Sequence, residues 1–164
     1  MKDEKFSEKI NEEFLKNCGE IIRIGLDLEN DLEFFISNYF IYPQNEKTFF
    51  LEDLIIQKLN FDKKINLFKK ICKKEGVNID NLIKDVREIQ NIRNKVAHRE
   101  ASIDSSENCI KLNRRESIKY KKDELKITSE LVEKLRKKKN KCRKEIFSIL
   151  DKIHENYGQY YKEI

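Results

Sequence analysis

Apolar residues recur every three or four positions along most of the chain, which is the spacing that places side chains on one face of an α-helix. The first stripe predicts an amphipathic helix over residues 7–40, which ends before Pro43. At roughly 50 Å this helix is long for a small protein. We therefore expect it to bend or break near Gly19 or Gly25.

The same spacing predicts three further helices before residue 100. A short apolar helix is expected at residues 49–59. Asn60 is a suitable N-cap for the next helix, which covers residues 61–74 and ends at Gly76. A fourth helix follows at residues 81–98.

The fourth helix has two candidate N-caps, Asn78 and Asp80. After it, residues 101–108 read as a polar loop. A last helix begins with the cap residue Thr128 and continues to about Tyr157. Its apolar stripe is as regular as that of the first helix.

Between these last two helices the apolar period changes from helical to two. Residues 109–113 and 117–121 alternate apolar and polar side chains, which predicts a β-hairpin joined by residues 113–116. We therefore expect an all-α fold, a bundle of about five helices with a small β-hairpin before the last helix.

A single domain over residues 1–164 accommodates these elements. Within it we assign the core helices to residues 1–100, the loop and hairpin to 101–127, and the C-terminal helix to 128–158.

The composition fits a cytoplasmic protein. Apolar residues make up 38% of the chain and charged residues 40%, and no apolar run is long enough to span a membrane. The first residues lead into a charged helix rather than into a signal peptide. The four cysteines lie far apart, without the close Cys or His pairs of a zinc site, so we expect four reduced thiols, no metal and no cofactor.

Charge is distributed unevenly along the chain. Residues 1–53 contain six Lys or Arg and 13 Asp or Glu, whereas residues 111–144 contain 15 and five. Two interpretations remain open: a basic surface for a polyanion, or complementary segments that pack together. The densest basic run, residues 136–144, either follows an RNA backbone or is a solvated helix face.

The end of the fourth helix carries the candidate chemistry. A polar row of Arg87, Asn91, Asn94 and His98 steps by three or four residues, and Arg93 lies beside it. Two groups suffice to cleave RNA without a metal. A histidine removes the proton of the ribose 2′-hydroxyl, because its pKa lies near neutral pH. An arginine stabilises the charge that develops on the phosphate.

Helical geometry limits how this pair can act. Arg93 and His98 are separated by about 140° around an ideal helix, whereas Asn94 and His98 share a face, so that Asn94 can orient the imidazole. The pair therefore needs a distorted helix end or a second copy of the helix, which a symmetric dimer supplies.

The string Ile-Arg-Asn-Lys-Val-Ala-His at the end of a helix resembles the HEPN family, the higher eukaryote and prokaryote nucleotide-binding domains. The mark of that family is Arg, four to six residues, then His. Many members have a polar residue after the Arg, as Asn94 does here, and Ala before the His, as Ala97 does. The resemblance extends over residues 20–100. Arg99 follows His98, whereas several members carry an aromatic residue shortly after this His.

The resemblance implies a dimeric helical fold and a metal-independent endoribonuclease, a hydrolase that binds RNA, with Arg93 and His98 as the catalytic pair and Asn94 in support. It also implies a toxin or an antiviral defence effector, in some toxin–antitoxin systems beside a nucleotidyltransferase antitoxin. The nearby basic residues are then candidates to bind RNA: Lys95, Arg99, Arg114 and Arg115.

Other interpretations compete with this one. Similar strings occur in proteins resembling the mannitol operon repressor, which implies a helical regulator or adaptor without catalysis. A third possibility is an RNA-binding module built on residues 111–144. Without a functional role, His98 is a helix C-terminal residue stabilised by the helix dipole, and Arg93 forms a salt bridge with Glu100 or Asp85.

Overall fold

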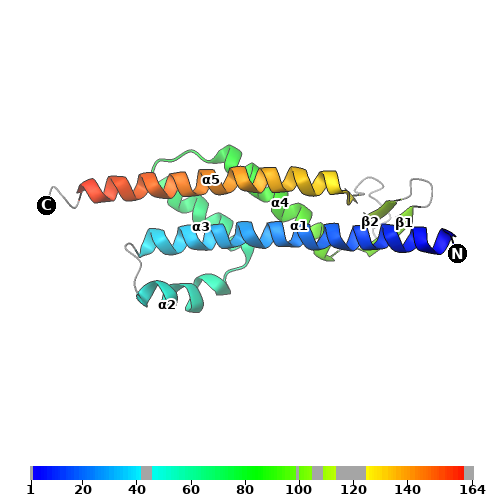
Figure 1. The fold of residues 1–164 in the computed structure, drawn as a ribbon. Coiled ribbons are helices and arrows are strands. Elements are labelled where there is room, and N and C mark those ends of the chain that lie inside the picture. Colours follow the sequence, from blue (N-terminus) through cyan, green and yellow to red (C-terminus); the bar gives the residue numbers. More distant parts are fainter. Residues whose placement is uncertain (1, 42–45, 99, 105–108, 114–124, 161–164) are drawn as a thin grey trace, which may run out of the picture. The chain divides into compact units, whose positions relative to one another are not determined.

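The computed structural model describes residues 2–41, 46–98, 100–104, 109–113 and 125–160 (Figure 1). Most of them belong to five α-helices: α1 (Lys2–Phe40), α2 (Glu46–Leu54), α3 (Phe61–Lys74), α4 (Asp80–His98) and α5 (Ser129–Tyr160). A 3-10 helix, η1, covers Ile56–Lys58. The predicted all-α fold with about five helices is confirmed.

Helix α1 continues without interruption through both of its glycines, so the predicted break is wrong. The stripe of apolar residues is buried on either side of Gly25, as at Ile24 and Leu28, and this burial holds the backbone helical. A glycine inside a helix costs only about 1 kcal/mol relative to alanine. Each buried isoleucine or leucine contributes roughly 1.5–3 kcal/mol. Burial of the stripe therefore outweighs the tendency of glycine to interrupt a helix.

The short second helix differs from its prediction, whereas its neighbour agrees. The segment expected at residues 49–59 is divided into α2 and η1. Helix α3 begins as predicted, because the side-chain oxygen of Asn60 accepts a hydrogen bond from the backbone N–H of Lys63 (2.9 Å).

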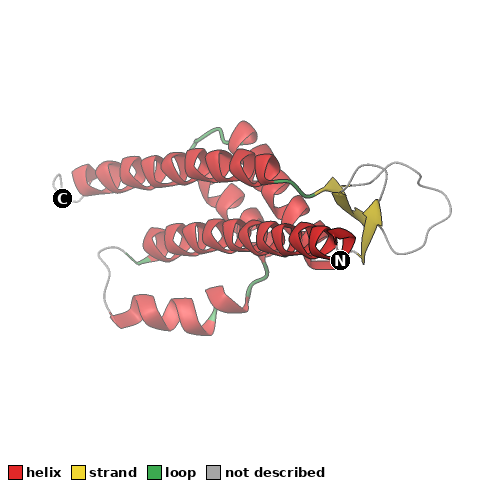
Figure 2. Ribbon diagram, turned by 45° about the vertical axis from the view of Figure 1, so that its right-hand side comes forward, coloured by secondary structure: helices red, strands yellow, loops and turns green. Residues whose placement is uncertain are grey.

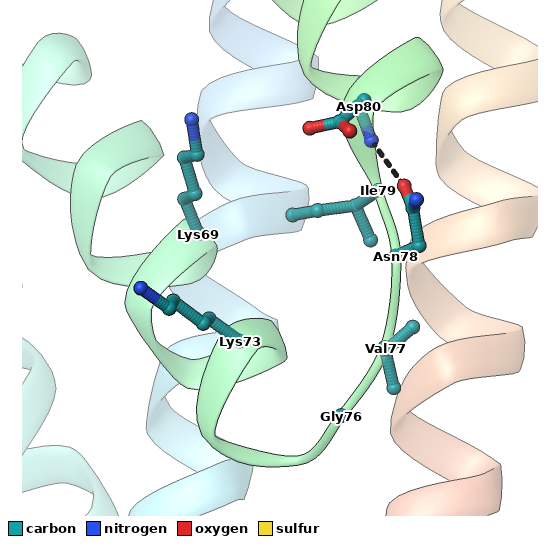
Figure 3. A pocket seen from close by; sticks show the side chains of 7 residues that line it. All are labelled: Lys69, Lys73, Gly76, Val77, Asn78, Ile79 and Asp80. Carbon is teal, nitrogen blue, oxygen red and sulfur yellow. Dashed lines mark hydrogen bonds between the residues drawn. The ribbon is translucent and has the colours of Figure 1, made fainter.

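The turn between α3 and α4 follows its local chemistry. Gly76 has a φ of 70°, which a residue with a side chain rarely adopts, and the N–H of Val77 donates to the carbonyl of Cys72 (2.8 Å). This hydrogen bond is the one that closes a Schellman motif. The side chain of Asn78 then accepts from the N–H of Asp80 (3.0 Å), at the first residue of α4 (Figure 3).

Three short strands lie between α4 and α5 in the chain, and Figure 2 shows the two longer ones in yellow. They are β1 (Glu100–Asp104), β2 (Cys109–Asn113) and β3 (Leu125–Lys126), and they form an antiparallel sheet in the order β1-β2-β3.

The predicted pairing of these strands is wrong. The strand at residues 109–113 is present, but its two sheet neighbours are β1 and β3 rather than residues 117–121, which lie outside the described residues. The segment expected to be a loop at 101–108 begins with β1 instead. Strand partners depend on contacts distant in sequence, which a period of two does not specify.

The chain divides into two compact units. The first contains residues 1–25 and 89–137. Its buried core comes from α1, α4, the strands and α5: Phe14, Ile21, Ile24, Ile89, Leu112, Ile127, Val132 and Leu135. Helix α5 begins as predicted, since the side-chain oxygen of Thr128 accepts from the N–H of Leu131 (3.2 Å).

The second unit contains residues 26–88 and 138–164. Phe35 of α1 and Phe68 of α3 are both fully buried and meet edge to face, with ring centroids 4.7 Å apart. Lys64 is also buried here, between the carboxylates of Glu29 and Glu33. Its side chain is 4% exposed, and its ammonium lies 2.7 Å from the Glu29 carboxylate.

Candidate functional site

The candidate site lies at the C-terminal end of α4, in the first unit. Arg93 lies about 20° around the helix from Val86 and about 40° from Ile89, both buried, so its side chain leaves α4 close to the core face. It does not belong to the polar row. Arg93 is accordingly half-buried, while His98 at the end of the helix is exposed.

The stem of Arg93 is packed against the backbone of α1 at Gly25. A Cβ atom placed on Gly25 would lie 2.8 Å from Cγ of Arg93 and 3.1 Å from its Cβ. Real Cβ atoms essentially never approach other atoms within 3.0 Å. The absence of a side chain at Gly25 is therefore what gives Arg93 its place between the two helices.

The guanidinium group of Arg93 is directed toward the next residue. Its Nη1 donates to Oδ1 of Asn94 (3.0 Å), whereas its Nε is buried and has no hydrogen-bond partner among the described residues. A buried donor without a partner costs about 1–3 kcal/mol. The carbons of the same side chain are packed against Gly25.

Asn94 links the two candidate catalytic residues geometrically. It precedes His98 by one turn of α4, which places the two side chains on the same face, about 40° apart. The hydrogen bond to Asn94 therefore draws the guanidinium of Arg93 from the core face toward the face of His98. On an ideal helix Arg93 and His98 point about 140° apart. The length of the arginine side chain reduces this separation at the guanidinium.

The members of the predicted polar row have different surroundings. Arg87 lies in the second unit, where it donates to Asp62 (2.8 Å) and Asn66 (3.0 Å) of α3. Asn91 is exposed on the first unit. Arg87 therefore has a structural partner, and the candidate site reduces to the part of the row around Asn94 and His98.

A salt bridge between Arg93 and Asp85 does not form. The carboxylate of Asp85 instead accepts from Lys138 (2.9 Å) and Lys141 (3.1 Å) in the second unit. The hydrogen bond from Lys138 has the largest effect on the pKa of Asp85, which it lowers, and the hydrogen bond from Lys141 lowers it further. The other expected partner of Arg93 was Glu100, whose side chain is not among those described.

Of the candidate RNA-binding residues, the structure describes one. Lys95 is half-buried on α4. Arg99, Arg114 and Arg115 lie outside the described residues, so their role remains a prediction.

The basic run of α5 is largely neutralised within the chain. In the first unit Arg136 bonds to Glu20 (3.2 Å) and Glu133 (2.6 Å). In the second unit, basic residues of α5 pair with carboxylates of α1 and α4: Lys138 with Asp85 and Glu88, Lys139 with Asp27, Lys141 with Asp85, and Arg143 with Asp31. These pairs favour the interpretation of complementary segments over that of a basic surface for a polyanion.

The cysteines do not extend the site. Cys18, Cys72 and Cys142 are free thiols, and burial raises the pKa of Cys72 and Cys142 to about 12. Such thiols are poor nucleophiles and metal ligands, because the reactive form is the thiolate. Within the described ranges, no group of three or more His, Cys, Asp or Glu is placed to hold a metal ion.

A hollow of about 300 Å³ lies at the turn between α3 and α4 in the second unit (Figure 3). Its polar lining combines Lys69 and Lys73 with Asn78 and Asp80, and its apolar lining is Val77 and Ile79. It contains none of the residues of the candidate site. Separately, no helix in the described part of the chain is long and apolar enough to cross a membrane.

Gly25 is the residue that sequence reasoning missed. We expected it to interrupt α1, and instead it provides the close approach of α1 to Arg93. The only signal in the sequence was its position on the apolar stripe, where a glycine inside a helix marks either a break or a close contact.

Comparisons with protein-family models, with curated proteins and with solved structures find no match to this chain.

Proposed function

We propose that this protein is a metal-independent endoribonuclease of the HEPN type, which uses Arg93 and His98 at the cleft of a homodimer. The proposal is supported chiefly by one observation. The stem of Arg93 is packed against Gly25 and its guanidinium is hydrogen-bonded to Asn94, and Asn94 shares a helix face with the exposed His98. An arginine that served only to bind solvent would need neither the glycine nor the asparagine.

The proposed reaction begins at the ribose. The imidazole of His98 removes the proton of the 2′-hydroxyl, and the 2′-oxygen attacks the adjacent phosphorus. The bond from phosphorus to the 5′-oxygen then breaks, which leaves a 2′,3′-cyclic phosphate and a 5′-hydroxyl. Arg93 stabilises the negative charge that develops on the phosphate oxygens.

A second copy of the helix completes this mechanism. The leaving 5′-oxygen needs a proton, and one histidine cannot remove and supply a proton in the same step. In a symmetric dimer, His98 of the second copy is available as the acid. The proposed dimer places the guanidinium of each Arg93 near a histidine of the other copy.

The biological setting proposed with this activity comes from the resemblance to the HEPN family. It is a cytoplasmic toxin or antiviral defence effector that cleaves RNA, with a nucleotidyltransferase antitoxin as a candidate partner. No metal and no cofactor takes part in the proposed reaction.

The test is cleavage of single-stranded RNA by the purified protein in EDTA. We expect the wild type to cleave and both Arg93→Ala and His98→Ala to lose activity by about a hundredfold or more. Asn91→Ala is the matched control, because Asn91 is exposed on the same helix and has no part in the mechanism. Equal cleavage by His98→Ala and the wild type would refute the proposal. A fold retained by all variants, measured by circular dichroism, excludes unfolding as the cause.

A non-catalytic regulator predicts a different result in the same assay, namely no cleavage by the wild type in any buffer. An RNA-binding module predicts RNA binding that is steeply salt-dependent and unaffected by His98→Ala. The ion pairs of α5 with acidic residues of the same chain argue against the RNA-binding module.

A further inference from the structure

The two described glycines of α1 have very different surroundings. A Cβ atom on Gly19 would meet nothing within 4 Å, whereas one on Gly25 would overlap Cγ of Arg93 at 2.8 Å. Gly19 is exposed and Gly25 is buried. A glycine in the middle of a helix is unfavourable relative to alanine, so Gly25 is explained by the contact it permits.

This contact determines where Arg93 points. On the α1 side, Cβ, Cγ and Cδ of Arg93 all lie within 4 Å of the Cβ position of Gly25. On the α4 side, Nη1 is hydrogen-bonded to Asn94, and between the two ends Nε is buried. The side chain is thus fixed at its stem by packing and at its tip by a hydrogen bond.

We infer that Gly25 is a positioning residue for Arg93: it sets the direction of the guanidinium by giving the arginine stem a place against α1. Gly25 itself touches no reacting atom. It acts through Arg93, since any side chain at position 25 must displace Cγ and so move the tip away from Asn94. The catalytic consequence of this inference rests on the proposed function, but the positioning does not.

Nuclear magnetic resonance of the arginine side chains tests the positioning without any assay of activity. The Nε–H group of Arg93 is buried and has no partner among the residues that the structure describes, so its proton should exchange slowly with water and have a distinct chemical shift. The signal is assigned by its absence in Arg93→Lys. We expect Gly25→Ala to shift this signal and to remove its protection from exchange, and Gly19→Ala to leave both unchanged.

Cleavage of single-stranded RNA by the same variants tests the catalytic consequence. We expect kcat of Gly25→Ala to fall by about a hundredfold, which is the loss that a misplacement of about 1 Å can cause. The KM should change less, because the misplaced guanidinium acts mainly in the transition state. Gly19→Ala should cleave like the wild type. An unshifted Arg93 signal in Gly25→Ala would overturn the positioning, and cleavage by Gly25→Ala equal to that of an active wild type would overturn its catalytic consequence.

Two other outcomes, an inactive wild type and an unfolded Gly25→Ala variant, also have a defined meaning. If the wild type does not cleave RNA, the proposed function is refuted, while the Arg93 signal still decides whether Gly25 positions the side chain. If Gly25→Ala does not fold, the double variant with Arg93→Ala decides instead. Recovery of folding in the double variant supports the inference, because the arginine stem is then the obstacle. An unfolded double variant, beside a folded Arg93→Ala, overturns it.

Discussion

The buried lysine of the second unit offers the most detailed prediction of stability. Lys64 is 4% exposed in its side chain and lies between Glu29 and Glu33, whose side chains are 14% and 22% exposed. Substitution of Lys64 by Met keeps most of the volume and removes the charge. Two largely buried carboxylates of α1, four residues apart, are then left facing each other without a cation.

The expected loss of stability follows from this geometry. Removal of one partner from a fully buried ion pair costs about 3–5 kcal/mol, and the partial exposure of the glutamates lowers that cost to roughly 2–3 kcal/mol. Repulsion between carboxylates at positions i and i+4 of a helix adds about 0.2–0.5 kcal/mol. The triple variant with Glu29→Gln and Glu33→Gln should recover most of the loss, because it leaves no unpaired charge.

The same cluster predicts a dependence on pH. Burial opposes the charge of Lys64, but its hydrogen bonds to Glu29 and Glu33 outweigh burial and raise its pKa. A raised pKa in the folded state stabilises the protein at pH values below the pKa of the unfolded chain, about 10.4. This contribution is lost as pH rises above that value, so the wild type should lose stability at alkaline pH more steeply than Lys64→Met.

The assay is unfolding in urea, followed by circular dichroism at pH 7 and between pH 9 and 11. Lys70→Met is the matched control, because Lys70 is an exposed lysine of the same helix. The reasoning is refuted if Lys64→Met is as stable as Lys70→Met at pH 7. It is also refuted if the two variants lose stability equally between pH 9 and 11.

Three further predictions follow from the same structure. Gly19→Ala should raise the free energy of unfolding by about 0.5–1 kcal/mol through helix propensity alone. Gly25→Ala should lower it, because an overpacked contact costs about 1–3 kcal/mol. A higher free energy of unfolding in urea for both variants would contradict the contact with Arg93. Asp31→Asn should raise the urea midpoint at pH 7, because burial raises the pKa of Asp31 and its charged form therefore weakens the fold. The gain in midpoint should shrink as pH falls through that raised pKa. A lower midpoint for Asp31→Asn at pH 7 would contradict this prediction. Mixed dimers of a wild-type chain and a His98→Ala chain should be as inactive as the His98→Ala homodimer, because one histidine cannot serve as both base and acid. Differently tagged chains isolate the mixed dimer for the cleavage assay; mixed dimers with half of the wild-type activity would exclude a site shared by two copies.

Local chemistry made much of the fold predictable from sequence. Asn60 and Thr128 begin helices as expected, because an N-cap needs only a side chain that reaches the N–H three residues ahead. Gly76 ends α3 for a similarly local reason, its positive φ. Helix α4 also ends at His98, as predicted.

Contacts between distant residues were not predictable. The sheet partner of residues 109–113 is decided by β1 and β3, and the alternating pattern gives no information on which segments pair. Gly25 was misinterpreted for the same reason, since only the approach of Arg93, distant in sequence, explains it.

The candidate site was likewise predictable only in its local features. The sequence identified Arg93, Asn94 and His98 by their spacing and resemblance. It did not reveal that Arg93 leaves α4 toward the core, nor that its guanidinium turns back to Asn94. Both features depend on which face of α4 meets α1.

The most direct test of the central claim is the chemistry of the RNA ends after cleavage in EDTA. Attack by the 2′-oxygen leaves fragments with 2′,3′-cyclic phosphate and 5′-hydroxyl ends, which mass spectrometry distinguishes from 3′-hydroxyl ends. We predict cyclic phosphate ends with the wild type and none with Arg93→Ala or His98→Ala. Intact RNA with the wild type, or fragments that end in a 3′-hydroxyl, would contradict the assignment of Arg93 and His98 as a catalytic pair.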